Sequence, residues 1–144
     1  MTHSDAGNYK AKHPSDIKIN ENIAKAVEKK SIDGMITCAD AEIIADALRV
    51  TMRDVGLAVD MMEIRISKCQ LGLFGYSPEK MIVKPADGVS EVLEKSIREA
   101  LLNGRLPCTA AWNIATQFGI PKMEVSAACE ALKIKVKPCQ LGAF

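Results

Sequence analysis

The sequence repeats itself with a period of 70 residues, and this internal repeat limits the possible folds more than any other feature. Residues 23–74 align without a gap with residues 93–144, and 14 of the 52 aligned positions are identical. The longest shared word is Cys-Gln-Leu-Gly, which begins at Cys69 in the first copy and at Cys139 in the second. An ungapped match of this length indicates duplication, so the chain is predicted to hold two copies of one small structural unit.

Polar and turn-forming residues divide the chain further. The amino-terminal residues are polar and contain both histidines, His3 and His13. Between the copies, Ser77-Pro78 and the segment 85–88 have the composition of turns, and they flank a short apolar run that is typical of a strand. The predicted organisation is a polar leader at 1–18, repeat one at 19–76, a linker with a short strand at 77–88, and repeat two at 89–144.

The composition is that of a globular protein with an aliphatic core. The chain is 48% hydrophobic and 26% charged but only 4% aromatic, so Ile, Leu, Val, Met and Ala must form the core. Nothing approaches the roughly 18 consecutive apolar residues of a membrane span, and the polar amino terminus lacks the apolar stretch of a secretory signal. We therefore expect a cytoplasmic protein with no membrane partner, whose five cysteines are reduced thiols.

Apolar residues recur at helical spacing at the start of each repeat. In repeat two the pattern predicts an amphipathic helix over 91–103. Asn103-Gly104 is expected to end this helix, because glycine accepts the left-handed conformation found at helix ends. Asp33-Gly34 has the same place in repeat one.

A second and a third helix are predicted in each repeat, separated by a sharp turn. The second helix is expected to extend to Leu48 in repeat one, where Thr37 and Asp40 have the spacing of a capping box. In repeat two the chain is expected to turn at Gly119 and to restart with Pro121 at the first helical position.

This part of the sequence resembles the helix-turn-helix motif of DNA-binding regulators. The resemblance lies in the spacing of Ala115, Gly119 and Val125, because the small alanine lets two helices approach closely and the glycine permits the turn. Repeat one keeps the alanine and the valine but has Arg49 in place of the glycine, and Arg49 must either take a less comfortable backbone conformation or reshape the turn. Thr51 offers a compensating cap for the helix that follows. The resemblance is at the level of the superfamily and covers about half of each repeat.

An alternating stretch follows the third helix, at 64–68 and at 134–138, and predicts a strand. In winged-helix proteins a strand at this place begins the wing, and residues 81–83 are expected to complete the wing of repeat one. Repeat two lacks such a partner, so its strand is expected to pair with repeat one or with another molecule, as in a homodimer. The predicted fold class is mainly α, with two tandem three-helix helix-turn-helix-like units that each end in a short β-strand.

The resemblance implies DNA contacts near the amino-terminal end and along the outer face of the third helix. The residues expected to contact DNA there and on the strand are Thr51, Arg53, Lys122, Ser126, Lys133, Lys135 and Lys137. Each outer face also carries an acid that repels phosphate, Asp60 or Glu130. Residues 23–74 hold 7 basic and 8 acidic side chains and residues 93–144 hold 7 and 4, so charge alone gives limited support to DNA binding. We interpret the chain as a DNA-binding, transcription-regulator-like protein.

Two alternatives remain open. A protein-interaction or assembly module with the same fold would bind a protein partner through the apolar third-helix face. A metal or redox sensor would use the four repeated cysteines, Cys38, Cys69, Cys108 and Cys139. Because paired cysteines two to four residues apart are missing, we interpret the four as packing residues and expect neither metal nor cofactor. The sequence shows no constellation of catalytic residues, so we do not expect an enzyme.

Overall fold

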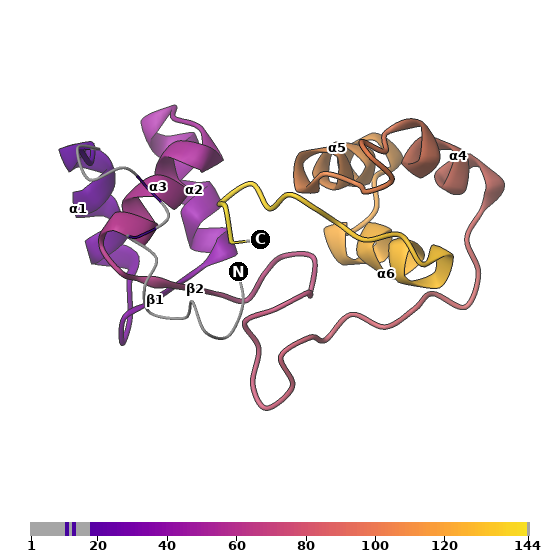
Figure 1. Ribbon diagram of the computed structural model, residues 1–144, viewed down its shortest axis with the longest axis horizontal. Helices are drawn as coiled ribbons and strands as arrows, with labels where there is room; N and C mark the ends of the chain where they lie inside the picture. The colour runs from indigo at the N-terminus through magenta and orange to yellow at the C-terminus, as the bar shows by residue number, and fades with distance from the viewer. Residues whose placement is uncertain (1–10, 12, 14–17, 144) are drawn as a thin grey trace. The chain divides into compact units, whose positions relative to one another are not determined.

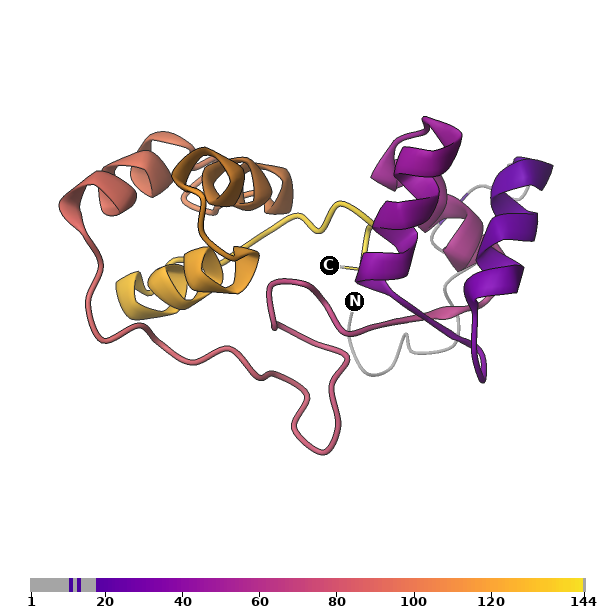
Figure 2. The same cartoon turned by 180° about the vertical axis from the view of Figure 1, so that it is seen from behind.

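The computed structural model describes residues 11, 13 and 18–143, and this part of the chain is mainly α-helical, as the periodicity predicts (Figures 1 and 2). Six helices and two short strands are formed within it. In chain order they are α1 (Glu21–Lys30), β1 (Met35–Thr37), α2 (Cys38–Leu48), α3 (Met52–Met61), β2 (Arg65–Ser67), α4 (Glu91–Glu99), α5 (Cys108–Phe118) and α6 (Lys122–Leu132).

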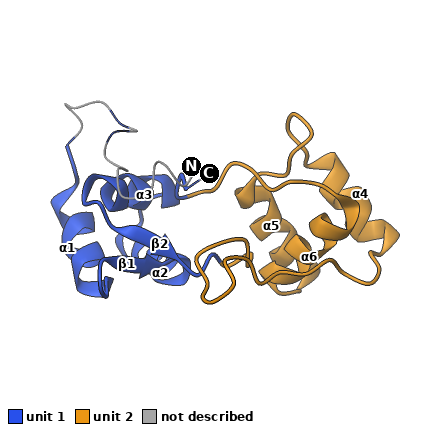
Figure 3. Ribbon diagram, turned by 60° about the horizontal axis from the view of Figure 1, so that its bottom comes forward, with its two compact units in different colours: residues 1–69, 141–143 blue, residues 70–140, 144 orange. Residues whose placement is uncertain are grey.

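The chain divides into two compact units, which Figure 3 shows in different colours. Unit 1 comprises the chain up to Cys69 together with Leu141–Ala143, and unit 2 comprises Gln70–Gln140. The boundary lies inside the repeated Cys-Gln-Leu-Gly word and not after residue 76, where repeat one was predicted to end. Unit 1 therefore contains the three helices of repeat one and Leu141-Gly142 from the end of repeat two. Unit 2 contains the three helices of repeat two and Leu71-Gly72 from the end of repeat one.

In unit 1 the helices α1, α2 and α3 pack against one another around an aliphatic core. Val27 of α1 and both Val55 and Val59 of α3 are fully enclosed. The buried residues of α2 include Ala41 and Ala45. Because alanine side chains are short, the axes of the packed helices can approach closely.

Unit 2 builds its core from the corresponding positions of repeat two. Helix α4 packs on α5, and α5 packs on α6. Each of the buried unit 1 residues named above has a buried counterpart 70 positions later. These counterparts are Ile97, Ala111, Ala115, Val125 and Cys129. The duplication therefore preserves the pattern of burial as well as the sequence word.

The turn between the second and third helices has a left-handed residue in both repeats. Gly119 ends α5 with φ 66° and ψ 33°, and Arg49 ends α2 with φ 55° and ψ 45°. Of the two alternatives expected for Arg49, the structure shows the less comfortable backbone conformation, since a residue with a side chain is strained at positive φ. Thr51 caps α3 in a full capping box, whereas Pro121 lies one residue before α6 and not at its first position as predicted.

The expectation that Asn103-Gly104 and Asp33-Gly34 end the first helices is wrong. Helix α4 ends at Glu99 and α1 at Lys30. Both dipeptides instead form tight turns between residues that pair as antiparallel bridges, and both residues of each dipeptide have positive φ. Two consecutive positive φ values are those of a type I′ turn, for which Asn-Gly and Asp-Gly are the preferred sequences.

The wing expected from residues 81–83 is also absent. Strand β2 pairs with β1 in parallel, with Ile36 opposite Ile66. In unit 2 the equivalent pairing is an isolated parallel bridge between Leu106 and Val136, so the segment after α6 pairs within its own repeat. The segment 81–83 turns back on the chain instead, where the N–H groups of residues 82 and 83 both donate to the Gly72 carbonyl oxygen.

The tight turn at Asn103-Gly104 gives a first test. Gly104 has φ 75°, and the space around its Cα is open, so Gly104→Ala would introduce strain without a clash. We expect a loss of about 1 kcal/mol in the free energy of unfolding. Gly88→Ala is the matched control, because Gly88 also faces open space but lacks a positive φ. Equal stabilities of the two variants in urea unfolding would contradict the assignment of a type I′ turn.

Candidate nucleic-acid interface

The amino-terminal end of α3 is exposed in unit 1. Thr51 and Arg53, both expected to contact DNA, lie on the surface. The Thr51 hydroxyl oxygen accepts the Asp54 N–H at 3.0 Å, and the Asp54 carboxylate accepts the Thr51 N–H at 3.3 Å. The capping box uses the side chain of Thr51, whereas the exposed Arg53 guanidinium forms no ion pair with any residue that the structure describes.

The middle of α3 is covered by protein. Gly56 is buried, and a Cβ atom built on it would overlap the carbonyl oxygen of Leu141, a residue of the same unit. Asp60 is only 3% exposed, and its carboxylate lies 2.8 Å from Nε2 of His13. The prediction that Asp60 projects from an outer face and repels phosphate is therefore wrong.

The middle of α6 is covered in the same way in unit 2. Ser126 has no exposed surface, which contradicts its predicted contact with DNA. The Ala127 carbonyl oxygen accepts the Ala86 N–H at 3.0 Å, so the linker runs along this helix. A Cβ atom at Gly72 would lie 3.1 Å from Sδ of Met123, which places the first Cys-Gln-Leu-Gly word on the same helix.

Lys122 is engaged inside unit 2. Its Nζ donates to Oε1 of Gln70 at 2.9 Å and lies 3.8 Å from the ring centroid of Trp112. A lysine that combines a hydrogen bond with a cation–π contact is held in place. Lys122 was predicted as a DNA contact, but in this arrangement it holds the first Cys-Gln-Leu-Gly word against the unit.

The three lysines after α6 are exposed as predicted. Lys133 ends α6 in a left-handed conformation, and Lys135 and Lys137 flank Val136 in the parallel bridge. Lys135 and Lys137 are two residues apart in extended chain, so their side chains leave the same face. The bridge between Leu106 and Val136 also places exposed Arg105 beside Lys135.

We call Arg105, Lys133, Lys135 and Lys137 the basic edge. Among the described residues, none of these four side chains takes part in an ion pair. Sequence reasoning missed Arg105, because its neighbourhood depends on the pairing of Leu106 with Val136. The type I′ signal of Asn103-Gly104 could have indicated that the chain turns back before Arg105.

The cysteines are buried or half-buried free thiols. Cys38 and Cys69 belong to unit 1, whereas Cys108, Cys129 and Cys139 belong to unit 2. The Gln140 side-chain amide donates to Sγ of Cys108 at 3.7 Å. Within the described part of the chain, no three His, Cys, Asp or Glu residues gather as metal ligands do.

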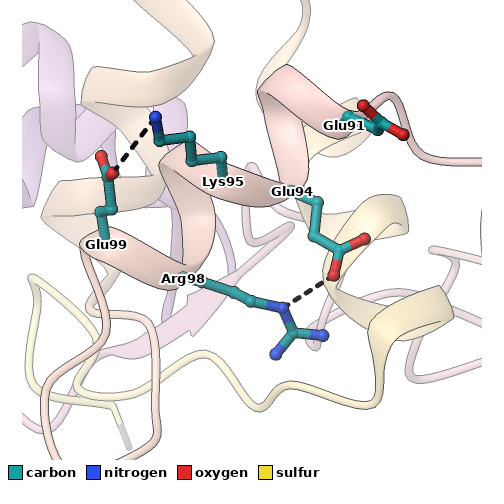
Figure 4. A pocket seen from close by; sticks show the side chains of 5 residues that line it. All are labelled: Glu91, Glu94, Lys95, Arg98 and Glu99. Atoms are coloured by element: carbon teal, nitrogen blue, oxygen red, sulfur yellow. Dashed lines mark hydrogen bonds and ion pairs between the residues drawn. The ribbon is translucent and has the colours of Figure 1, made fainter.

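A shallow hollow lies along α4 and is lined by one face of that helix alone (Figure 4). Arg98 contacts Glu94 at 2.8 Å, and Lys95 contacts Glu99 at 4.0 Å. Both are ion pairs between residues four apart on an exposed helix, which contribute a few tenths of a kcal/mol. The hollow is the solvated face of α4 and offers no convergent set of groups to a ligand.

Neither a protein-family model, nor a curated protein, nor a solved structure shows significant similarity to this chain. None of the helices in the described residues is long and apolar enough to cross a membrane. The functional argument therefore depends on the chain's own geometry.

The buried thiol of Cys129 gives a second test. Burial raises the pKa of this thiol from 9.0 to about 11, and the adjacent Glu130 carboxylate adds to the shift. In the unfolded chain the Cys129 thiol ionises at a lower pH than in the folded protein. Its contribution to the free energy of unfolding is therefore complete below pH 9.0 and is lost as the pH rises toward 11. We expect the wild type to lose about 2 kcal/mol more than Cys129→Val over this window.

The measurement is the free energy of urea unfolding at several pH values between these limits. Valine is the matched replacement, because Val59 occupies the equivalent core position of repeat one. The comparison cancels the titration of lysines and tyrosines, which both chains share. Parallel pH profiles for the two proteins would show that the Cys129 thiol titrates normally.

Proposed function

We propose that this protein is a cytoplasmic, nucleic-acid-binding regulator-like protein, and not an enzyme, built from a duplicated helix-turn-helix-like unit. The basic edge of unit 2 carries this proposal. It presents four exposed cations on adjacent segments, and none of them forms an ion pair within the described residues. Such a set is suited to DNA phosphates, because each neutralised phosphate releases counterions and adds to the affinity.

The third helices favour phosphate contacts over base reading in this conformation. Their centres are covered by the chain, and Ser126 and Gly56 are buried. Arg53 remains exposed at the amino-terminal end of α3, which is the end that approaches bases in helix-turn-helix proteins. Contacts to phosphate position a protein but carry no sequence information. We therefore propose binding to duplex DNA with little dependence on sequence.

The test is a comparison of two variants against the wild type in duplex binding measured by fluorescence anisotropy at a series of salt concentrations. The double variant Lys135→Ala with Lys137→Ala removes two neighbouring cations of the basic edge. We expect it to bind more weakly and to reduce the slope of log K against log salt by about 2, since each phosphate contact contributes about 1. Arg53→Ala should reduce the slope by about 1 if the end of α3 also contacts phosphate.

Lys25→Ala is the matched control, because Lys25 is an exposed helix lysine outside the basic edge. Its slope should equal that of the wild type. Two duplexes of unrelated sequence should be bound with similar affinity. Absence of binding to both duplexes at low salt, or equal losses for the control and the double variant, would contradict the proposal.

A protein-interaction module is the second candidate function. The observation in its favour is that the third helix contacts the repeated word in both units, through Gly56 against Leu141 in unit 1 and through Met123 against Gly72 in unit 2. A helix surface that packs against a peptide segment in this way suits a protein ligand. If the wild-type protein binds no duplex at low salt, the protein-interaction module becomes the favoured function.

A further inference from the structure

The centre of α3 in unit 1 has the features of a peptide-docking site. The segment Leu141–Ala143 lies in this unit, where Leu141 is 2% exposed and Ala143 is 8% exposed. Gly142 between them is exposed, so the two residues of the segment that carry side chains are both buried in the unit. The segment therefore contributes two apolar anchors on either side of a bend at Gly142, which has φ 80°.

Gly56 makes the close contact of this segment possible. A Cβ atom on Gly56 would overlap the Leu141 carbonyl oxygen and would lie 2.7 Å from its carbonyl carbon and 2.9 Å from its Cα. The obstructed atoms belong to the backbone, so a side-chain rotation cannot relieve the clash. Glycine within a helix is unfavourable for the helix itself. Its presence at this position is explained by the close approach of the segment.

The other copy of the word occupies the equivalent helix of unit 2. Leu71 is fully buried, and a Cβ atom built on Gly72 would lie 3.1 Å from Sδ of Met123 and 3.2 Å from Cβ of Val83. Met123 is in the first turn of α6, near the buried Ser126 that corresponds to Gly56. The Leu-Gly of the repeated word thus packs on the third helix of the unit formed by the other repeat, in both units.

We infer that the centre of α3 is a docking site for the Leu141–Ala143 segment, and that a second copy of this chain can supply the segment. The segment is joined to unit 1 only through the whole of unit 2, so the same contacts can form between two chains. Within one chain the covalent link gives the segment a high effective concentration, which favours docking onto its own unit. This inference does not depend on DNA binding.

The experiment uses two complementary full-length variants. Gly56→Ala blocks the docking site and leaves the segment free, whereas Leu141→Ser weakens the segment and leaves the site free. Each variant alone should remain monomeric. Mixed at chain concentrations of about 1 mM, the two should form a complex of one copy each, because the free segment of the first docks onto the free site of the second. Sedimentation equilibrium measures the masses.

The matched control replaces Gly56→Ala with Gly88→Ala. Gly88 faces open space, so this variant keeps its own segment docked and should form far less complex with Leu141→Ser. Circular dichroism establishes that each variant is folded. If the mixture of folded Gly56→Ala and Leu141→Ser proteins contains only monomers, the inference is overturned. It is also overturned if Leu141→Ser forms as much complex with Gly88→Ala as with Gly56→Ala.

A second measurement keeps the test decisive if either variant fails to fold. A synthetic peptide of residues 137–143 is added to the isotope-labelled wild-type chain, and the amide resonance of Ala143 in the chain is followed. The peptide should displace the chain's own segment and shift this resonance. A peptide with serine in place of Leu141 should not. Equal shifts from both peptides, or no shift from the first, would overturn the docking site.

Discussion

The close packing of the second helix on the third is the interaction on which the rest of each unit depends. Ala45 of α2 and Ala58 of α3, with Ala115 of α5 and Ala128 of α6, are buried, and none has a side chain long enough to separate packed helices. The left-handed residue between the helices, Arg49 or Gly119, directs the chain back over this alanine contact. The strain at Arg49 is tolerated because the packing of two helices determines its backbone.

Local patterns in the sequence predicted the helices and missed the pairings. The second and third helices follow from apolar periodicity and from a glycine at one turn, which are features of neighbouring residues. Asn103-Gly104 was misinterpreted because a helix end and a type I′ turn both use positive φ at glycine. The parallel contact of Leu106 with Val136 joins residues 30 positions apart, and an alternating pattern does not specify its partner.

In the candidate site too, local sequence patterns do not predict contacts between residues that are distant in the chain. Exposure of Arg53 and of the three lysines after α6 follows from their charge and from the polar side of a local pattern. The burial of Ser126, Gly56 and Asp60 does not follow from a local pattern, because segments distant in sequence cover these residues. Leu141 and Gly56 are 85 positions apart (141 − 56), and only the packed structure brings them together. A polar residue on the outer side of a predicted helix is exposed only if no other segment lies there.

The two units preserve one core and differ in the chemistry of their surfaces. The lysines at 133, 135 and 137 replace Glu63, Arg65 and Ser67 of the first repeat, and Arg105 replaces Met35. These exchanges leave the parallel pairing intact, because the residues that pack beneath it, Ile66 and Leu106 among them, stay aliphatic. Conversely, Gly56 of unit 1 is matched by Ser126 in unit 2, so the close backbone approach belongs to unit 1. A duplicated core thus carries a basic edge in one unit and a buried helix glycine in the other, since surface residues can change without cost to the packing below them.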